Sequence, residues 1–489
     1  MNQRFQSCLL LFAMLCAIGC VRLGPDYERP DIGLKPPGSY HESDFKEKGL
    51  PVPEDRWWQG FGDPEIDKLV EAVLKNNPDI QRAAARILEV RSRFKEAGAD
   101  RYPSVNLQAE YRKQHQSITN PFTGSVESET ADLWSLSLPA SFELDLWGRL
   151  ARAEEAARAE LLIAGENRRT IAQSLIAEAV TLYFQMEMLE RSIWINRQSI
   201  QTYQESLNLV EGRYRRGLTS VLDVHQARRR LAQAEAALPS LTQDLGKVQQ
   251  QLAILQGRYP RTGQARSHEA DYYRNLSPVP PGLPSDLLAR RPDILAAEAR
   301  LRQLNEMVGV AKANRFPRIT LTGGFGYASG ELDSLFKPES ELWNIAAGGL
   351  FPVFNAGKLA AQQRGAEARY QQGVADYAKT VLAAFSEVEG SLFVRKQQLE
   401  KRQRVVNFLE QARATQEVAQ QRYERGLADY LTVLESQQTR FSAEENLVLV
   451  DFSIFSNRVT LHRALGGGWG NPEQPDNGET SDNKTDQTE

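Results

Sequence analysis

The chain has 489 residues, a formal net charge of -4 and a mean hydropathy of -0.48. That length allows two or three ordinary domains or one elongated architecture, and the small net charge indicates neither nucleic acid nor an anionic membrane surface as the partner. All three cysteines lie in the first twenty residues, so the rest of the chain forms no internal disulfide and its fold depends on packing.

The first twenty residues resemble a bacterial lipoprotein signal. Arg4 precedes an apolar run over residues 8–18, which is too short to span a membrane, and the run ends on Gly19-Cys20. We therefore predict a signal peptide over residues 1–19 and lipidation of Cys20. The alternative is an ordinary secretory signal with an incidental cysteine. Since Val21 stands where Asp would indicate inner-membrane retention, the resemblance implies delivery to the outer membrane.

Residues 20–62 are rich in proline and polar groups, which predicts an extended arm without a core of its own. From about Asp63 the pattern becomes helical, and Pro103 ends it. An amphipathic strand is expected directly after this proline, because Val105, Leu107, Ala109 and Tyr111 alternate with polar residues.

A second strand is predicted in the stretch WSLSLPASFELDLWGR at 134–149. Its apolar residues share one parity and its polar residues the other, which is the period of an amphipathic strand. The apolar set is Trp134, Leu136, Leu138, Ala140, Phe142, Leu144 and Leu146. We expect the polar stretch 113–132 to be the loop that joins the two strands into a hairpin.

Two long helices follow the strands. Residues 140–238 contain no proline and are dense in strong helix formers. The clear break is RYRRGLTS at 213–220, where Gly217 suits a helix end, and Ser220 with Asp223 suits a capping box for the returning helix. The outgoing helix, at about 60 residues, would reach roughly 90 Å, which no compact globule needs.

The pattern then repeats. RRPDILAAEARL at 290–301 matches NNPDIQRAAARI at 76–87 at an offset of 214, and RYERGLADYLTV at 422–433 matches RYRRGLTSVLDV at 213–224 at an offset of 209. The chain is thus predicted to carry a tandem duplication of one helix, a strand hairpin and a helical hairpin. The expected second strand pair is 318–327 and about 342–354. The expected domains are a first repeat at 63–256, a linker at 257–284, a second repeat at 285–465 and a disordered acidic tail at 466–489.

Each repeat offers two strands of about ten residues, the length of a tilted membrane-crossing strand. Four strands cannot close a barrel, and open edges are not tolerated in lipid, so closure requires other copies of the chain. Three copies would give twelve strands and a wide lumen. The competing interpretation is a soluble amphipathic strand packed on a helical core.

Several motifs together resemble the outer membrane factors of TolC type. These motifs are GPDYERP after Cys20, RWWQGFGDPEIDKLV at 56–70, FELDLWGRL at 142–150 and PPGLPSDLLARRPDILAAEARL at 280–301. They are most similar to the lipoprotein branch that serves resistance-nodulation-division (RND) efflux pumps. The resemblance implies a mixed α+β, mainly α fold in a homotrimer, with a twelve-stranded transmembrane β-barrel continued by a long periplasmic α-helical barrel.

The same resemblance implies function and partners. The trimer would export drugs or other small toxic compounds across the outer membrane, docked to a periplasmic adaptor and an inner-membrane RND pump. An outer channel for heavy-metal efflux or for type I protein secretion remains the alternative. The expected localisation is the cell outer membrane, both lipid-anchored and membrane-spanning, with a periplasmic extension.

The two helical turns are the expected gate. TolC-type proteins carry acidic rings in the second tip, and the inner ring position corresponds to Glu435, whereas the outer position here is Thr432. Leu431 and Tyr430 are expected to form an apolar constriction. Asp223 would either hold a neighbouring hairpin through a basic residue or only cap its helix. The remaining tip residues, expected at the adaptor contact, are Arg216, Gly217, Arg425 and Gly426. The arginines at 213–216 and 228–230 would be solvated, seat the adaptor or pair with other hairpins.

Other classes of protein fit less well. The five histidines show no metal-ligand spacing, and the chain has no nucleophile elbow and no phosphate-binding glycine loop, so we expect no enzyme, no cofactor and no metal site. A lipid-anchored coiled-coil scaffold would leave both strand hairpins without a purpose. Met186 and Met188 are consistent with a copper or silver route, but ordinary helix packing is the simpler interpretation.

Overall fold

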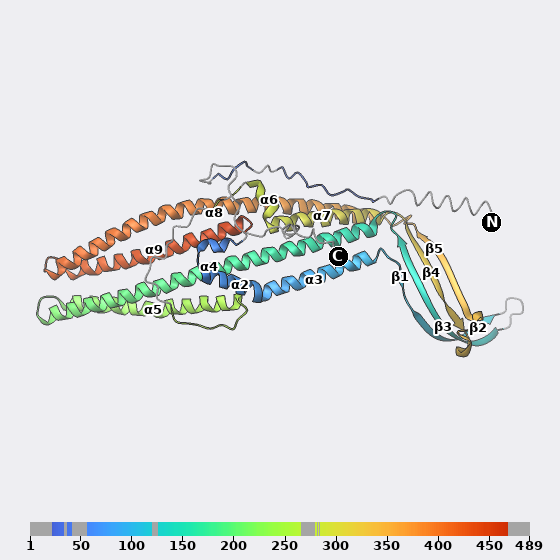
Figure 1. The fold of residues 1–489 in the computed structure, drawn as a ribbon, viewed down its shortest axis with the longest axis horizontal. Helices are drawn as coiled ribbons and strands as arrows, with labels where there is room; N and C mark the ends of the chain where they lie inside the picture. Colours follow the sequence, from blue (N-terminus) through green and yellow to red (C-terminus); the bar gives the residue numbers. More distant parts are fainter. Residues whose placement is uncertain are drawn as a thin grey trace, which may run out of the picture. The chain divides into compact units, whose positions relative to one another are not determined.

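The computed structural model describes residues 22–33, 37–41, 56–119, 126–265, 279–280, 282 and 284–467. They form two compact units, and each unit takes segments from both repeats. Unit 1 contains the described parts of 22–33, 86–165 and 296–378, and unit 2 those of 37–85, 166–295 and 379–467. Figure 1 shows the order of the elements along the chain.

The helices of the two repeats correspond one to one. The α-helices are α2 Pro64–Asn76, α3 Pro78–Ala99, α4 Arg149–Arg215, α5 Val221–Leu255, α6 Leu287–Arg290, α7 Pro292–Ala313, α8 Lys358–Glu424 and α9 Tyr430–Ala464. Both outgoing helices, α4 and α8, have 67 residues, and both returning helices, α5 and α9, have 35. The predicted duplication is confirmed in these equal lengths.

The helix predicted to run from Asp63 to Pro103 is two helices. Asn77 separates α2 from α3 with an extended backbone (φ -66°, ψ 126°), since it precedes Pro78 and a residue before proline avoids the helical region. Asn77 is itself buried, and its side-chain amide donates to the Leu255 carbonyl at the end of α5 (2.9 Å). The break is therefore used to close the end of a distant helix.

In the second repeat a different side chain bonds the end of the returning helix. Arg291, which is 214 positions after Asn77, is buried and donates to the Ala464 carbonyl at the end of α9 (2.8 Å). The glycines after the two returning helices also correspond, because Gly257 (φ 66°) lies against the backbone of Asn76 and Gly466 (φ 87°) against that of Arg290. The duplication thus preserves the helix ends as well as the helix lengths.

The strands form one antiparallel sheet in unit 1. They are β1 Ser104–Val105, β2 Gln108–Thr119, β3 Val126–Leu144, β4 Arg318–Ser329 and β5 Glu341–Leu350. Strands β1 and β2 both pair with β3, β3 pairs with β4, and β4 pairs with β5. Because β1 and β2 follow each other along the same edge of β3, the sheet has the four strand positions that the sequence predicts.

Four strand boundaries differ from the prediction. The stretch 113–132 is not a loop: β2 continues to Thr119 and β3 starts at Val126. Its Ser, Thr and His side chains pair across the hairpin, as in His115 with Thr130 (2.8 Å), so polar composition alone was a poor guide. Strand β3 ends at Leu144 rather than 146, and β5 ends at Leu350 rather than 354, just before Pro352.

The apolar residues of the sheet gather on one face. The register places Leu138 opposite Phe325 and Phe325 opposite Trp343, and these three side chains are 44%, 45% and 70% exposed. Neighbouring positions on the other face carry Ser137 and Gly326. The predicted alternation in both strand hairpins is confirmed, and its apolar face is left open to the surroundings of the chain.

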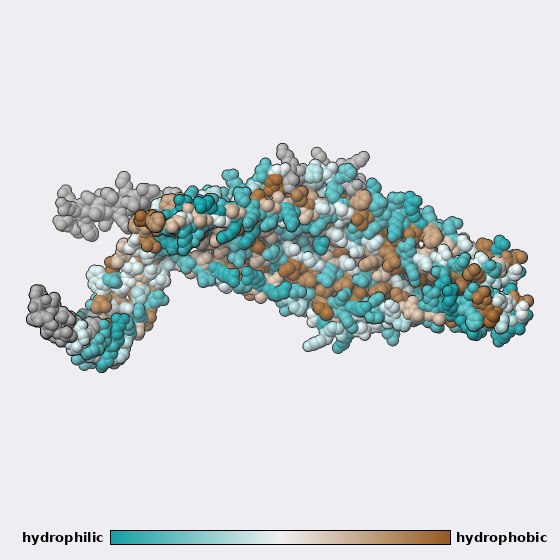
Figure 2. All heavy atoms as spheres, turned by 180° about the vertical axis from the view of Figure 1, so that it is seen from behind, coloured by the Kyte–Doolittle hydropathy of each residue, from teal (hydrophilic) through white to brown (hydrophobic). Residues whose placement is uncertain are grey.

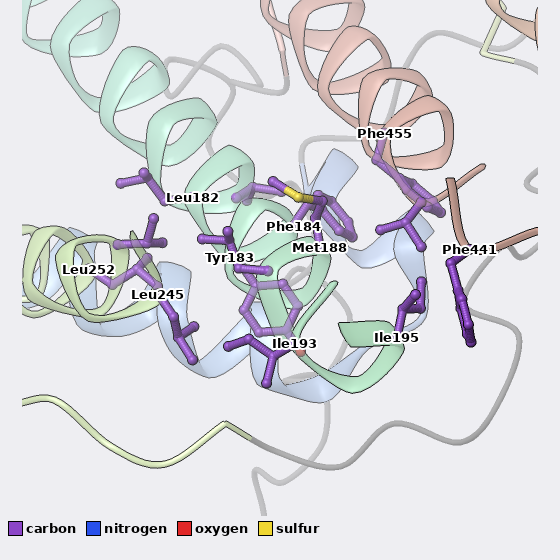
Figure 3. Close-up of a cluster of buried hydrophobic side chains, with 14 of the residues drawn as sticks. Leu182, Tyr183, Phe184, Met188, Ile193, Ile195, Leu245, Leu252, Phe441 and Phe455 are labelled. Carbon is purple, nitrogen blue, oxygen red and sulfur yellow. The ribbon is translucent and has the colours of Figure 1, made fainter. Parts of the chain in front are cut away.

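The core of unit 2 lies between the long helices and the N-terminal short ones. Figure 3 shows Phe184 and Met188 of α4, Leu245 of α5 and Phe455 of α9 pointing into it. The rings of Phe184 and Phe455 stack at 4.8 Å. Trp57 and Phe61, from the 3-10 helix η1 Trp57–Phe61, complete the cluster, so part of the predicted arm belongs to the core.

Outside that core the helices are polar. Figure 2 shows hydrophilic side chains over most of the visible face of the helices. Within the described residues, no helix combines the length and the apolar character that crossing a membrane requires.

Candidate functional site

The first hairpin tip, between α4 and α5, is a closed turn. Gly217 (φ 73°) reverses the chain, and the Ser220 hydroxyl accepts from the Leu222 amide (3.1 Å) at the start of α5. The Asp223 carboxylate accepts from the Ser220 amide (3.4 Å) and from the Thr219 hydroxyl. The predicted capping box is confirmed, and Asp223 serves its own turn.

The second tip, between α8 and α9, uses the same device with the residues exchanged. Asp429 takes the place of Ser220, and Thr432 takes the place of Asp223, each 209 positions later. The Asp429 carboxylate accepts from the amide and hydroxyl of Thr432 (2.8 and 2.6 Å), and these hydrogen bonds lower the pKa of Asp429. The departure from the family pattern at Thr432 therefore has a local reason. Sequence reasoning missed Asp429, although aligning the two tips at the offset of 209 would have found it.

The two tips contact each other through aromatic and polar side chains. The Arg213 guanidinium of the first tip lies 4.8 Å from the centre of the Tyr423 ring of the second tip, where the Tyr423 and Tyr430 rings are 5.7 Å apart. Arg230 of α5 also donates to Gln438 of α9. Tyr430 is buried, with 2% of its surface exposed, and this burial raises the pKa of its hydroxyl. A side chain buried inside the protomer cannot line a constriction between copies, so the prediction for Tyr430 is wrong.

The other predicted gate residues are accessible. Leu431 is 44% exposed, and Glu435 lies one helical turn further along the same exposed face of α9. Arg216, Gly217, Arg425 and Gly426 are all exposed at the two turns, and Arg216 donates to the Gly212 carbonyl (3.1 Å). The second tip thus exposes Leu431 and Glu435 of α9 beside a turn that carries Arg425.

The arginine runs divide between local and cross-hairpin contacts. Arg228 pairs with Glu211 inside the first hairpin (2.7 Å), whereas Arg213 and Arg230 reach the second hairpin through the contacts given above. Arg215 and Arg229 are exposed. Two of the arginines thus contact the second hairpin of the same chain, but through an aromatic ring and a neutral amide rather than through the expected ion pairs.

The arm in unit 1 is held by ion pairs to a buried arginine, which sequence reasoning missed. Arg152 of α4, with 4% of its side chain exposed, pairs with Glu306 of α7 (2.9 Å) and Asp26 of the arm (3.1 Å). Gly24 (φ 106°) lies so close to Gly309 that a Cβ there would be 2.7 Å from its Cα. The arm's GPDYERP motif is thus a docking sequence, and Cys20 lies outside the described residues.

Nothing in the described residues resembles a metal centre. No group of three or more His, Cys, Asp or Glu side chains within them is placed to hold an ion. Met188 is buried and Met186 packs against the core, so ordinary helix packing accounts for both. A cavity of about 910 Å³ between α4, α8 and α9 has balanced charge, with Arg191, Arg402, Arg413 and Arg440 facing Glu410, Glu417, Glu424 and Glu444.

Comparison with known proteins identifies relatives over nearly the whole chain. The family model described as outer membrane efflux protein matches residues 69–258 and 283–467. The solvent efflux pump outer membrane protein SrpC of Pseudomonas putida is 32% identical over 469 residues, which cover 95% of this chain and 99% of SrpC. The cation efflux system protein CusC of Escherichia coli is 30% identical, with 94% and 98% covered. The solved outer-membrane channel OprN superimposes with a TM-score of 0.84 at 30% identity, with 91% and 99% covered.

Proposed function

Because this chain belongs to the outer membrane efflux protein family, we propose that it forms, as a homotrimer, the outer-membrane duct of a tripartite efflux pump. The strand sheet crosses the outer membrane and the helices extend into the periplasm, as in other channels of the family. In the proposed assembly the periplasmic end meets an adaptor, which links it to an inner-membrane RND pump. The duct is passive, and the chain has no catalytic activity of its own.

The observation that most strongly supports a trimer is the open sheet. Its edge strands β2 and β5 each pair on one side only among the described residues, and one face is apolar. Unpaired backbone groups are costly in lipid, so the edges must pair with other copies. Two copies would give eight strands, whose interior side chains fill, whereas three give twelve and an open lumen.

We further propose that the periplasmic mouth closes at the α8–α9 tips. Three copies of Glu435 would form an acidic ring, with Leu431 as the apolar constriction one turn away. Asp223 supports this arrangement by holding the first turn rigid, and Arg216, Gly217, Arg425 and Gly426 face the adaptor. Like charges at a narrow mouth concentrate cations and bind multivalent blockers.

The ring is tested by single-channel recording of the purified protein in planar bilayers. Divalent or trivalent cations added on the periplasmic side should block the wild type, and Glu435→Ala should weaken that block, whereas Glu435→Asp, which keeps the charge, should retain it. Cross-linking of each variant confirms that the trimer has assembled. Unchanged block in an assembled Glu435→Ala trimer contradicts the ring, and cross-linking that stops at dimers contradicts the proposed trimer.

For the cargo we propose small toxic organic compounds. SrpC is named for solvent efflux and CusC for cation efflux, so the family relationship by itself supports either class. The packing of Met188 in the core and of Met186 against it supports the organic class, because helix packing accounts for both side chains without a soft metal ion. Loss of the gene should therefore raise sensitivity to solvents or drugs more than to silver or copper.

The anchor and the sequence domains also remain proposals. We propose that cleavage after residue 19 leaves Cys20 as a lipidated N-terminus, followed by the docked arm. The repeats, the 257–284 linker and the acidic tail keep their predicted boundaries, and most of the tail lies outside the described residues. Intact-mass measurement of the mature protein tests the anchor, since an unmodified N-terminus at another residue would contradict it.

A further inference from the structure

The end of the sheet that meets the helices carries a different charge in the two repeats. In the first repeat each cation has a carboxylate. Arg101 donates to Glu154 (2.6 Å), and Arg149 makes a two-pronged contact with Glu143 (3.0 and 2.8 Å). Asp145 is used as well, because it accepts from the Ala151 amide (2.8 Å). The charges at this end of the first repeat are therefore balanced within the repeat.

In the second repeat the acceptors have become neutral. Arg315 corresponds to Arg101 at the offset of 214, and it donates to Gln363 (2.8 Å), which corresponds to Glu154 at the offset of 209. Pro352 and Phe354 stand at the positions of Glu143 and Asp145. The cations were thus kept while their carboxylates were lost.

Four cations of the second repeat remain without an ion pair among the described residues. Arg315, Arg318, Lys358 and Arg364 are exposed, and none of them makes an ion pair in the part of the chain that the structure describes. The sequence has no Asp or Glu from 307 to 330 or from 342 to 366. We call these four side chains the rim cluster.

The members of the rim cluster lie around one junction. Arg315 follows α7 and donates to Gln363 in α8, and Arg364 is the next residue of that helix. Arg318 opens β4 and donates to Asn314 (2.6 Å), and Lys358 opens α8. The cluster therefore surrounds the point where the strands of the second repeat give way to its helices.

This junction lies at the periplasmic surface of the outer membrane, because the strands cross the membrane and the helices are periplasmic. The arm supports the same placement. The Leu23 amide donates to the Trp147 carbonyl (3.1 Å), at the turn between β3 and α4. Cys20 is three residues earlier, so its acyl chains would enter the membrane within about 11 Å of that turn.

We infer that the rim cluster binds the anionic headgroup of a phospholipid in the periplasmic leaflet. Guanidinium groups match the geometry of phosphate oxygens, and basic residues are attracted to anionic lipid at a membrane surface. Apolar side chains stand beside the cations, with Val353 and Phe354 exposed at 93% and 88%. A charged group next to apolar surface suits a phospholipid better than the carboxylates of a second copy. The inference rests on the membrane placement of the strands, not on the cargo or the gate.

Native mass spectrometry of the full-length protein in detergent tests this inference, because it reports the number of subunits and of bound lipids together. Phosphatidylglycerol and phosphatidylethanolamine are added in equal amounts. The wild type should retain phosphatidylglycerol preferentially, and the triple variant Arg315→Gln, Arg318→Gln, Lys358→Gln should lower that preference by roughly a hundredfold, at about fivefold per charge.

The duplication supplies matched controls. Gln363→Glu gives Arg315 the carboxylate of the first repeat and should weaken phosphatidylglycerol retention, whereas Glu154→Gln frees Arg101 and should strengthen it. Equal retention of the two lipids by the wild type, or an unchanged ratio in the triple variant, overturns the inference. So does loss of the trimer in the triple variant with the lipid ratio unchanged, which would assign the cations to contacts between copies. A wild type that is not a trimer but retains phosphatidylglycerol would contradict the proposed oligomer alone.

Discussion

The two repeats agree in backbone and differ in chemistry. Their helices have the same lengths, and both returning helices end on a glycine of positive φ. At equivalent places the side chains are Asn77 and Arg291 at the helix closures, and a carboxylate and an amide at the sheet end. Positions fixed by backbone geometry survived duplication, whereas the side chains at charged positions diverged.

The largest difference between the repeats is expected at the helix closures. Arg291 holds Asp293 (2.7 Å), Glu387 (2.9 Å) and the Ala464 carbonyl, so Arg291→Leu removes a buried cation from two carboxylates and should cost about 3 kcal/mol. Asn77→Leu removes a neutral amide from the Leu255 carbonyl and should cost about 1–2 kcal/mol. Thermal unfolding of the two variants measures the order, and equal melting temperatures would show that charge adds nothing at this position.

The glycines after the returning helices should differ less. A Cβ on Gly257 would lie 2.5 Å from the Asn76 carbonyl oxygen, whereas one on Gly466 would lie 3.4 Å from Arg290. Both substitutions put an alanine in the left-handed region, but only the first also makes a Cβ clash with backbone. We therefore expect the free energy of unfolding to fall by about 2 kcal/mol or more for Gly257→Ala and by about 1 kcal/mol for Gly466→Ala. The reverse order in thermal unfolding would break the correspondence drawn between the two helix ends.

The smallest expected effect is a pH dependence of stability that comes from His462 in the second repeat. Burial, with a smaller contribution from Arg458, lowers the pKa of His462 to about 3, and its ring stacks on Trp57 at 5.1 Å; Ala253 stands at the equivalent position of the first repeat. Below its ordinary pKa of about 6.5 the unfolded chain binds a proton that the folded chain excludes. The contribution of His462 to stability is therefore fully present well above that pH and should fall by about 1 kcal/mol between pH 6.5 and 5.5.

The control for this dependence is His462→Phe, which keeps the stacking on Trp57 and removes the titrating group. Melting temperatures recorded across pH 5.5–7.5 should flatten in this variant relative to the wild type. An equal slope in both proteins would assign the pH dependence to other groups.

Periodic features could be predicted from the sequence, and pairwise contacts could not. The alternation that placed Leu138 and Phe325 on one apolar face needs only the period of a strand, and the capping box at Ser220 and Asp223 needs only local spacing. Tyr430 was misplaced because its burial depends on Tyr423 packing against it from the other arm of the hairpin. The polar strand ends near His115 were missed for a similar reason, since their stability comes from cross-strand partners that composition does not reveal.

The unequal arms of the hairpins have a mechanical consequence. A returning helix of 35 residues holds its tip about 52 Å from its other end, so one degree of rotation there moves the tip by roughly 0.9 Å. The hydrogen bond between Arg230 and Gln438 lies near the tip ends of α5 and α9. The aromatic core around Phe184 and Phe455 lies nearer the opposite end of α9. A few weak contacts at the tips therefore resist a displacement that the core hardly registers, and a rotation of a few degrees at the core end would move the tips by several ångströms.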